Sequence, residues 1–271
     1  MSAVPSHVTR SSIPAKDVLP FDERQPEAIR LYPLSNYTFG TKEAQPEEDP
    51  SVKDRLKRLE EYYGRYGMRR SGEGVLVCHE HNHPHILMIQ IANAFFKLPG
   101  DWLDYNVDEI QGFTERMNER LAAPPGTSLA STSPQTWNVH STLATWWRPN
   151  FDQFMYPFLP PHATRPKECK KLYLLQLPES RVLSVPKNMK LLAVPLFELY
   201  DNSPRYGPQI SALPHYLSRF RWEFVDEGGK VVAWTPGGTV DERVKTKILA
   251  GGEDLKSEMN GNGEVKMEDV T

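Results

Sequence analysis

The chain has 271 residues, of which 39% are hydrophobic and 25% are charged, and its formal net charge at neutral pH is −3. This length and composition predict one main domain with a hydrophobic core and additional segments at its ends. No apolar run reaches the roughly 18 residues of a membrane-spanning helix, and the N-terminus lacks a secretory signal pattern, so we expect a soluble protein with no membrane partner. The two cysteines, Cys78 and Cys169, have neither metal-ligand spacing nor the density of a disulfide scaffold, which predicts buried, reduced thiols.

The charges are spread unevenly along the chain. Residues 1–30 carry four acidic and four basic residues, and residues 226–271 carry ten acidic and six basic residues, so the part between them has a small positive charge. A nearly neutral core argues against nucleic-acid binding through many phosphate contacts, but it permits recognition of a few bases. Both terminal segments are too polar to offset the entropy of ordering by burial. We predict a flexible N-terminal segment (1–30), one domain (31–225) and a disordered acidic C-terminal tail (226–271).

The first elements of the domain are predicted to be a helix and a β-hairpin. Ser51 is a suitable N-cap for a helix over residues 52–66. Its expected buried face consists of Val52, Leu56, Leu59 and Tyr63, which recur at helical spacing. Residues 74–92 contain two apolar runs around a polar centre with Asn82 and Pro84, which predicts a hairpin with its turn at these two residues.

The next elements complete the predicted fold. Phe95–Ala123 reads as a strand, a Pro-Gly loop and then a helix. The apolar face of that helix is expected to consist of Ile110, Phe113, Met117 and Leu121. The unbroken apolar run in residues 170–178 predicts a strand that is buried on both faces, and two helical turns are expected in 195–201 and 210–220. Residues 123–135 read as a loop. Mixed strands and helices predict an α/β or α+β class with a mixed sheet.

Several polar and aromatic clusters were weighed as functional sites. Four alternating histidines, His79, His81, His83 and His85, would share one face of an extended strand, as a zinc site requires. The predicted turn reverses the chain between them, so we expect solvated histidines and no metal site. The basic residues of 164–171 are expected to be solvated, and Trp146, Trp147 and Phe151 to lie in the core or in an interface. Signatures of serine hydrolases, P-loop proteins and Rossmann folds are missing.

The segment Phe95–Ala123 resembles a Nudix box, a motif in which glutamates on a helix hold metal ions. In the alignment, the glutamate positions are occupied by Val107, Arg116 and Arg120, and Glu119 is the acidic residue that remains. A register shifted by one position would place an arginine at the apolar position that Met117 fills, so the apolar face fixes this alignment. The resemblance therefore implies a Nudix-like α/β/α sandwich without catalytic residues, a metal site or a cofactor.

Longer motifs narrow the resemblance to one family. The stretches LYPLSNYTFGTKE, GMRRSGEGVLVCHEH, FFKLPG, WWRPNF, VPKNMKLLAVPLFELYDN, YGPQIS and LPHYLSRF follow one another in the chain, and they are similar to the small, Nudix-like subunit of pre-mRNA cleavage factor I. The similarity covers about residues 31–224. It implies a nuclear homodimer that binds the RNA element UGUA upstream of polyadenylation sites. It also implies a larger partner subunit with an RNA-recognition domain.

The same resemblance implies the RNA-binding residues. They are Phe95 for base stacking, Glu47, Arg55 and Glu73 for base edges, and Tyr206 and Gly207 for aromatic and backbone contacts. Adjacent residues of a strand face opposite sides, so Phe96 is the core candidate and Phe95 the exposed one. Two positions depart from the family pattern, Ala94 in place of threonine and Phe158 in place of tyrosine. Two alternatives remain open, an active Nudix hydrolase of nucleotides or dinucleoside polyphosphates and a scaffold that has lost RNA binding.

Overall fold

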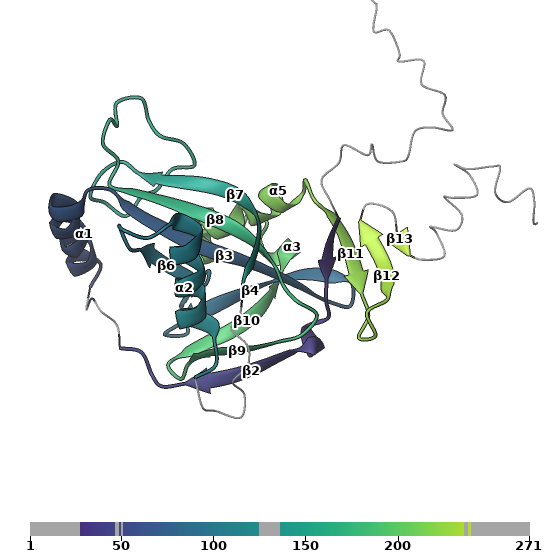
Figure 1. The fold of residues 1–271 in the computed structure, drawn as a ribbon. Coiled ribbons are helices and arrows are strands. Elements are labelled where there is room, and N and C mark those ends of the chain that lie inside the picture. The colour runs from purple at the N-terminus through teal and green to yellow at the C-terminus, as the bar shows by residue number, and fades with distance from the viewer. Residues whose placement is uncertain (1–27, 47–48, 50, 125–135, 236–237, 240–271) are drawn as a thin grey trace, which may run out of the picture.

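A central mixed β-sheet organises the protein (Figure 1). The computed structural model describes residues 28–46, 49, 51–124, 136–235 and 238–239. Across the sheet the strands follow the order β10 (Met189–Pro195), β4 (His83–Ile91), β3 (Arg69–Glu80), β8 (Glu168–Gln176) and β7 (Asn138–Arg148), with β5 (Phe95–Lys97) beside β4 and β6 (Gly100–Leu103) beside β3. Strands β3 and β8 are parallel, whereas the other neighbouring pairs are antiparallel. The predicted mixed sheet is therefore confirmed.

The two faces of this sheet are buried against different elements. Alternate residues of β3, Val75 and Val77, share a core with α4 (Ser203–Ser211) and α5 (Leu213–Leu217). Their neighbours Leu76 and Cys78 share a second core with α2 (Glu109–Leu121). Strand β8 is buried on both faces in the same way, as predicted. The protein is thus an α/β/α sandwich, and both cysteines are buried as free thiols.

Helix α2 packs on the sheet through one apolar face. Phe113, Met117 and Leu121 have no exposed surface, which confirms three of the four predicted positions. Ile110 in the first turn is exposed, so its predicted burial is wrong. The buried Met117 agrees with the register that was chosen for the Nudix-like motif, since its side chain contacts the sheet in the second core.

Helix α1 (Val52–Tyr66) lies at the edge of the molecule, to the left in Figure 1. Ser51 caps it, because its Oγ accepts a hydrogen bond of 3.1 Å from the amide of Asp54. Leu59 is 2% exposed, but Val52 is exposed and the other two predicted face residues are half-buried. The predicted buried stripe is therefore wrong at three positions, because a helix at the sheet edge has little surface to pack against.

The hairpin of β3 and β4 is confirmed, with a shorter turn than predicted. His81 and Asn82 form the turn with φ angles of 50° and 61°, the left-handed pair that two-residue hairpin turns need. His79 and His85 are buried, so their predicted solvation is wrong. His79 Nε2 lies 2.7 Å from the carbonyl oxygen of Val225 and joins this hairpin to the C-terminal strands.

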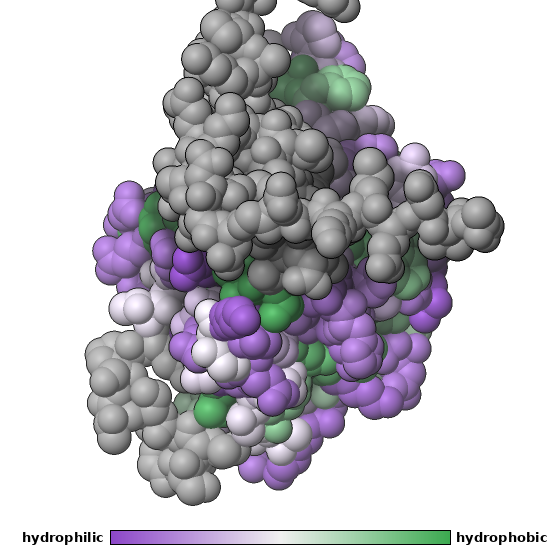
Figure 2. All heavy atoms as spheres, turned by 90° about the vertical axis from the view of Figure 1, so that its right-hand side faces the viewer, coloured by the Kyte–Doolittle hydropathy of each residue, from purple (hydrophilic) through white to green (hydrophobic). Residues whose placement is uncertain are grey.

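Strands at both ends of the described chain form a second sheet. Its order is β1 (Ala28–Leu31), β11 (Arg221–Val225), β12 (Val231–Thr235) and β13 (Gly238–Thr239), and β1 runs parallel to β11. Figure 2 views the molecule from this side, where hydrophilic and hydrophobic residues are interspersed on the described surface. The predicted domain boundaries at residues 30 and 225 are therefore wrong, because strands begin before the first and continue past the second. The rest of both predicted tails, and the predicted loop beyond Pro124, lies outside the described residues.

The remaining elements are short. Strand β2 (Tyr37–Lys42) pairs in parallel with β9 (Arg181–Pro186) after the 3-10 turn η2 (Leu34–Asn36). Helix α3 (Leu196–Leu199) and helix α5 confirm the two predicted helical turns. In the described part of the chain, no helix has the length and apolar character needed to cross a membrane.

Candidate nucleic-acid interface

Strand β5 presents one aromatic ring to solvent and one to the core. Phe95 is 73% exposed, whereas Phe96 packs against the first core and lies 4.8 Å, between ring centroids, from Tyr206. The alternation expected for this pair is confirmed. An exposed ring held by a strand costs little conformational entropy on binding, since its backbone is already fixed by pairing with β4.

Lys97 lies on the same face of β5 as Phe95, two residues further along the strand. Burial and repulsion from Arg120 lower the pKa of Lys97 to about 8. Lys170 and Arg55 also lower this pKa by smaller amounts, whereas the carboxylate of Glu73 raises it. Glu73 pairs with Gly100 in the strand that follows β5, three residues after Lys97. Sequence reasoning missed Lys97. Because alternate residues of a strand share one face, its position two residues after Phe95 was enough to predict that the two side chains lie on the same face.

Glu73 is a half-buried carboxylate with a fixed partner. Its Oε1 accepts a hydrogen bond of 2.7 Å from Lys170 Nζ, which also lies 3.3 Å from Gln209 Oε1. Burial alone would lower the pKa of Lys170, but the carboxylates of Glu73 and Glu168 outweigh this effect and raise it. Lys170 was predicted to be solvated, and this is wrong because the ion pair with Glu73 holds it inside the site.

Tyr206 and Gly207 lie on the other side of Phe96, in α4. Tyr206 is nearly buried and its hydroxyl donates a hydrogen bond of 2.5 Å to Glu198 Oε1. Burial and this bond raise the pKa of Tyr206 to about 12, so the hydroxyl stays protonated at neutral pH. Gly207 has a φ of 78° and interrupts the helix, a conformation that glycine adopts without steric cost. The guanidinium of Arg205, a further residue that sequence reasoning missed, covers the rings of Phe96 and Tyr206 at 5.7 and 5.2 Å.

Four of the six residues that the resemblance assigns to RNA therefore lie on or next to strand β5 and the loop that follows it. Phe95 projects to solvent, Glu73 pairs with Gly100, and Tyr206 and Gly207 lie behind Phe96. Arg55 lies in the first half of helix α1. Glu47 lies outside the described residues. Whether these residues bind RNA stays a prediction.

Arginines occupy the part of α2 where a Nudix enzyme would hold metal ions. Arg116 pairs with Glu119 at 2.8 Å and with Asp104 at 3.2 Å, and its Nε donates to the carbonyl oxygen of Trp102 at 3.0 Å. Arg120 pairs with Asp101. Asp101, Asp104 and Glu119 are thus each bound to an arginine that competes with a metal ion. Within the described residues, no group of three or more His, Cys, Asp or Glu side chains could hold a metal ion.

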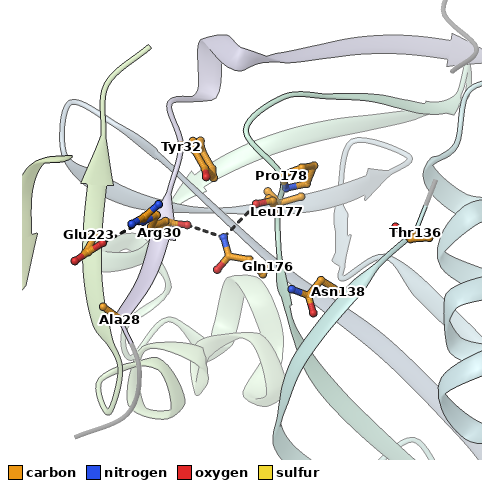
Figure 3. A pocket seen from close by; sticks show the side chains of 9 residues that line it. All are labelled: Ala28, Arg30, Tyr32, Thr136, Asn138, Gln176, Leu177, Pro178 and Glu223. Atoms are coloured by element: carbon orange, nitrogen blue, oxygen red, sulfur yellow. Dashed lines mark hydrogen bonds and ion pairs between the residues drawn. The ribbon is translucent and has the colours of Figure 1, made fainter. Parts of the chain in front are cut away.

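The larger of two described clefts lies away from these residues. Its volume is about 650 Å³, and it is lined by residues of β1, β11 and the facing ends of β7 and β8. Figure 3 shows Arg30 paired with Glu223, and Gln176 Nε2 donating to the carbonyl oxygens of Arg30 at 2.9 Å and Leu177 at 3.1 Å. None of the predicted RNA-binding residues lines this cleft.

Comparison with known proteins finds a family model, two named relatives and a similar solved structure. A Nudix family model, described as nucleotide hydrolase, matches residues 27–220. A protein named pre-mRNA cleavage factor Im 25 kDa subunit 2 from Arabidopsis thaliana is 52% identical over 199 residues, covering 73% of this chain and 97% of that protein. A protein named cleavage and polyadenylation specificity factor subunit 5 from Dictyostelium discoideum is 41% identical over 201 residues, covering 74% of this chain and 98% of that protein. Among solved structures, a MutT protein from Bacillus halodurans is similar with a TM-score of 0.35 and 9% identity, covering 62% of this chain and 96% of its own.

Proposed function

This chain belongs to the family of the 25 kDa subunits of pre-mRNA cleavage factor Im, and we propose that it is a non-catalytic subunit that binds the single-stranded RNA element UGUA upstream of polyadenylation sites. The relatives' names support a role in the 3′-end processing of mRNA. The observation that carries the proposal is the exposed Phe95 ring on the same face of β5 as Lys97, with the fixed carboxylate of Glu73 on strand β3 opposite Gly100. Single-stranded RNA is recognised by stacking unpaired bases on aromatic rings and by hydrogen bonds to their edges, and this strand offers both.

Base selection would come from the charged groups around the ring. The Arg55 guanidinium can donate two parallel hydrogen bonds to a base edge, and the Glu73 carboxylate can accept from base N–H groups. The ion pair with Lys170 fixes the orientation of Glu73, so little side-chain entropy is lost when a base binds. Glu47 is the third proposed edge-reading group. Gly207 supports close approach of the backbone to RNA, since a Cβ added there would meet no atom within 4 Å.

The lack of catalysis is proposed from the charges on α2. A Nudix enzyme needs several carboxylates around a metal ion that stabilises charge developing on the phosphates. Here Arg116 binds Glu119 and Asp104, and Arg120 binds Asp101. The alternative, an active nucleotide hydrolase, is favoured by the description of the matching family model. Mg²⁺-dependent cleavage of a dinucleoside polyphosphate that is abolished by Glu119→Gln would favour the hydrolase.

The proposed assembly is a nuclear homodimer with a larger subunit that carries an RNA-recognition domain. Exposed aromatic rings support the presence of protein interfaces, since large apolar side chains gather at such surfaces; among them are Phe154, Phe158 and Phe197. Of the two locations expected for Trp146, the core and an interface, its burial inside the protomer favours the core. Light scattering at micromolar concentration tests the dimer, and a pull-down from a nuclear extract tests the larger subunit.

The central experiment is a titration of the full chain with UGUA RNA and with a scrambled RNA of the same composition. Because one good bidentate base contact discriminates by about 1–3 kcal/mol, UGUA should bind at least about tenfold more tightly. Equal affinity for the two RNAs would contradict the proposal and would favour a scaffold that does not bind RNA.

A further inference from the structure

A row of aromatic side chains lies beside the proposed RNA site, at the edge of the molecule. We call Tyr62, Tyr66, Trp102 and Tyr105 the aromatic ridge. The centroids of Tyr62 and Tyr66 are 6.0 Å apart, those of Tyr66 and Tyr105 are 4.9 Å apart, and those of Tyr62 and Trp102 are 6.1 Å apart. The planes of neighbouring rings differ by only 24° to 33°. The ridge is therefore a nearly parallel stack rather than the edge-to-face packing common in cores.

The cores of the protein do not include this ridge. None of its four rings belongs to either hydrophobic core, and Tyr66 is 55% exposed. Helix α1 is anchored through Leu59, which is nearly fully buried. Another aromatic residue of α1, Tyr63, turns away from the ridge and packs against Phe151. A group of aromatic rings at the surface that the core does not require is typical of a binding surface.

The charges around the ridge favour RNA over other ligands. The guanidinium of Arg116 lies over the Trp102 ring at 4.9 Å, and Arg69 acts on the Tyr105 hydroxyl. Helix α1 itself carries five basic and three acidic residues. Stacked rings with interleaved cations are the surface that single-stranded nucleic acid uses without sequence preference.

The ridge is continuous with the proposed UGUA site. Arg55 and Tyr62 are seven residues apart on α1, so they lie on the same side of the helix and about 10 Å apart along its axis. Arg55 is one of the residues proposed to read a base edge of UGUA, so the ridge begins about two helical turns from a residue of that site. An RNA strand whose base is held by Arg55 can thus follow the helix to Tyr62 and Tyr66.

We infer that the aromatic ridge binds nucleotides that flank the UGUA element in the same RNA strand, by stacking that does not depend on their sequence. This inference rests on the proposed function, because the ridge extends that site. It assigns to α1 two separate tasks. Its N-terminal half reads a base through Arg55, and its C-terminal half holds the flanking strand.

The test compares RNAs whose flanks have bases with RNAs whose flanks are abasic. Each RNA carries one UGUA element followed or preceded by several adenosines, and its abasic counterpart keeps every phosphate and sugar. The wild-type full chain should bind one of the adenosine-flanked RNAs about fivefold or more tightly than its counterpart, since stacking is lost with the base. The variant Tyr66→Leu should lose this preference, and Tyr66→Phe, which keeps the ring, should retain it.

Each outcome decides the inference. Equal binding of adenosine-flanked and abasic RNAs by the wild type would overturn it, as would a full preference in Tyr66→Leu. A retained preference in Tyr66→Leu together with lost binding of the purified larger subunit would assign the ridge to a protein partner instead. Failure of the proposed function is distinguishable, because UGUA and scrambled elements would then bind the wild type equally. Because Tyr66 is exposed and leucine favours helices, Tyr66→Leu should melt near the wild-type temperature.

Discussion

The two phenylalanines of β5 should separate RNA binding from folding. Phe95 is 73% exposed, so Phe95→Ala should change the free energy of unfolding by less than about 0.5 kcal/mol. Loss of one base stacked on an aromatic ring costs roughly 1–3 kcal/mol, so its affinity for UGUA RNA should fall by about tenfold or more. Phe96 contacts the core and Tyr206, so Phe96→Ala should lower the free energy of unfolding by about 2 kcal/mol.

Two assays on the same protein samples measure these effects. Fluorescence anisotropy with labelled UGUA RNA gives the affinity, and urea denaturation gives the free energy of unfolding. Phe96→Ala serves as the matched control, because it removes the same atoms one residue away. If Phe95→Ala binds UGUA RNA within about twofold of the wild type, or if it is destabilised as much as Phe96→Ala, the assignment of Phe95 as the stacking ring is wrong.

Four further outcomes are expected. Arg55→Ala should weaken binding of UGUA RNA more than binding of scrambled RNA, because a group that reads a base edge distinguishes RNA sequences whereas a phosphate contact does not. Equal losses of affinity for the two RNAs in a competition titration would refute this role. Burial and nearby cations lower the pKa of Lys97 to about 8, so this side chain loses its positive charge above that pH. The affinity for RNA should therefore fall between about pH 7 and about pH 9, and Lys97→Met should abolish this pH dependence. Gly100 has a φ of 139°, and a Cβ there would lie 2.1 Å from the carbonyl oxygen of Gly72, so Gly100→Ala should cost about 3 kcal/mol of stability or prevent folding. Gly64 lies in helix α1 with no atom near the position of a Cβ, so urea denaturation should show that Gly64→Ala stabilises the protein by about 0.5–1 kcal/mol. The logarithm of the RNA affinity should fall with the logarithm of salt concentration with a slope of about one to three released ions, and a slope of five or more would contradict recognition by stacking.

Local patterns predicted the elements whose burial depends on their own sequence. Three of the four positions on the apolar face of α2 and the alternation of Phe95 and Phe96 are confirmed, because helical and strand periodicity fix the direction of each side chain. The stripe of α1 was wrong since periodicity shows which residues share a face but not how much of that face is covered. Only Leu59 of that stripe is buried.

Long-range pairing explains what the sequence did not reveal. Strand β1 was predicted to belong to a flexible segment, but it pairs with β11, and Arg30 bonds to Glu223 across 193 positions of the chain. Lys170 was predicted to be solvated, but it binds Glu73 across 97 positions. A four-residue strand or a lysine has no local signal for a partner so distant, because the entropy of closing such a loop is offset only by the assembled sheet.

Paired charges decide how the proposed site can recognise RNA. Lys170 is neutralised by Glu73, Arg120 by Asp101, and Arg116 by Glu119 and Asp104. Lys170 and Arg120 cannot bind RNA phosphates without breaking ion pairs that are mostly buried, and breaking such a pair leaves an uncompensated charge. In the function proposed above, the energy of binding therefore comes mainly from rings and base edges, and specificity rests on the bases rather than on the phosphate backbone.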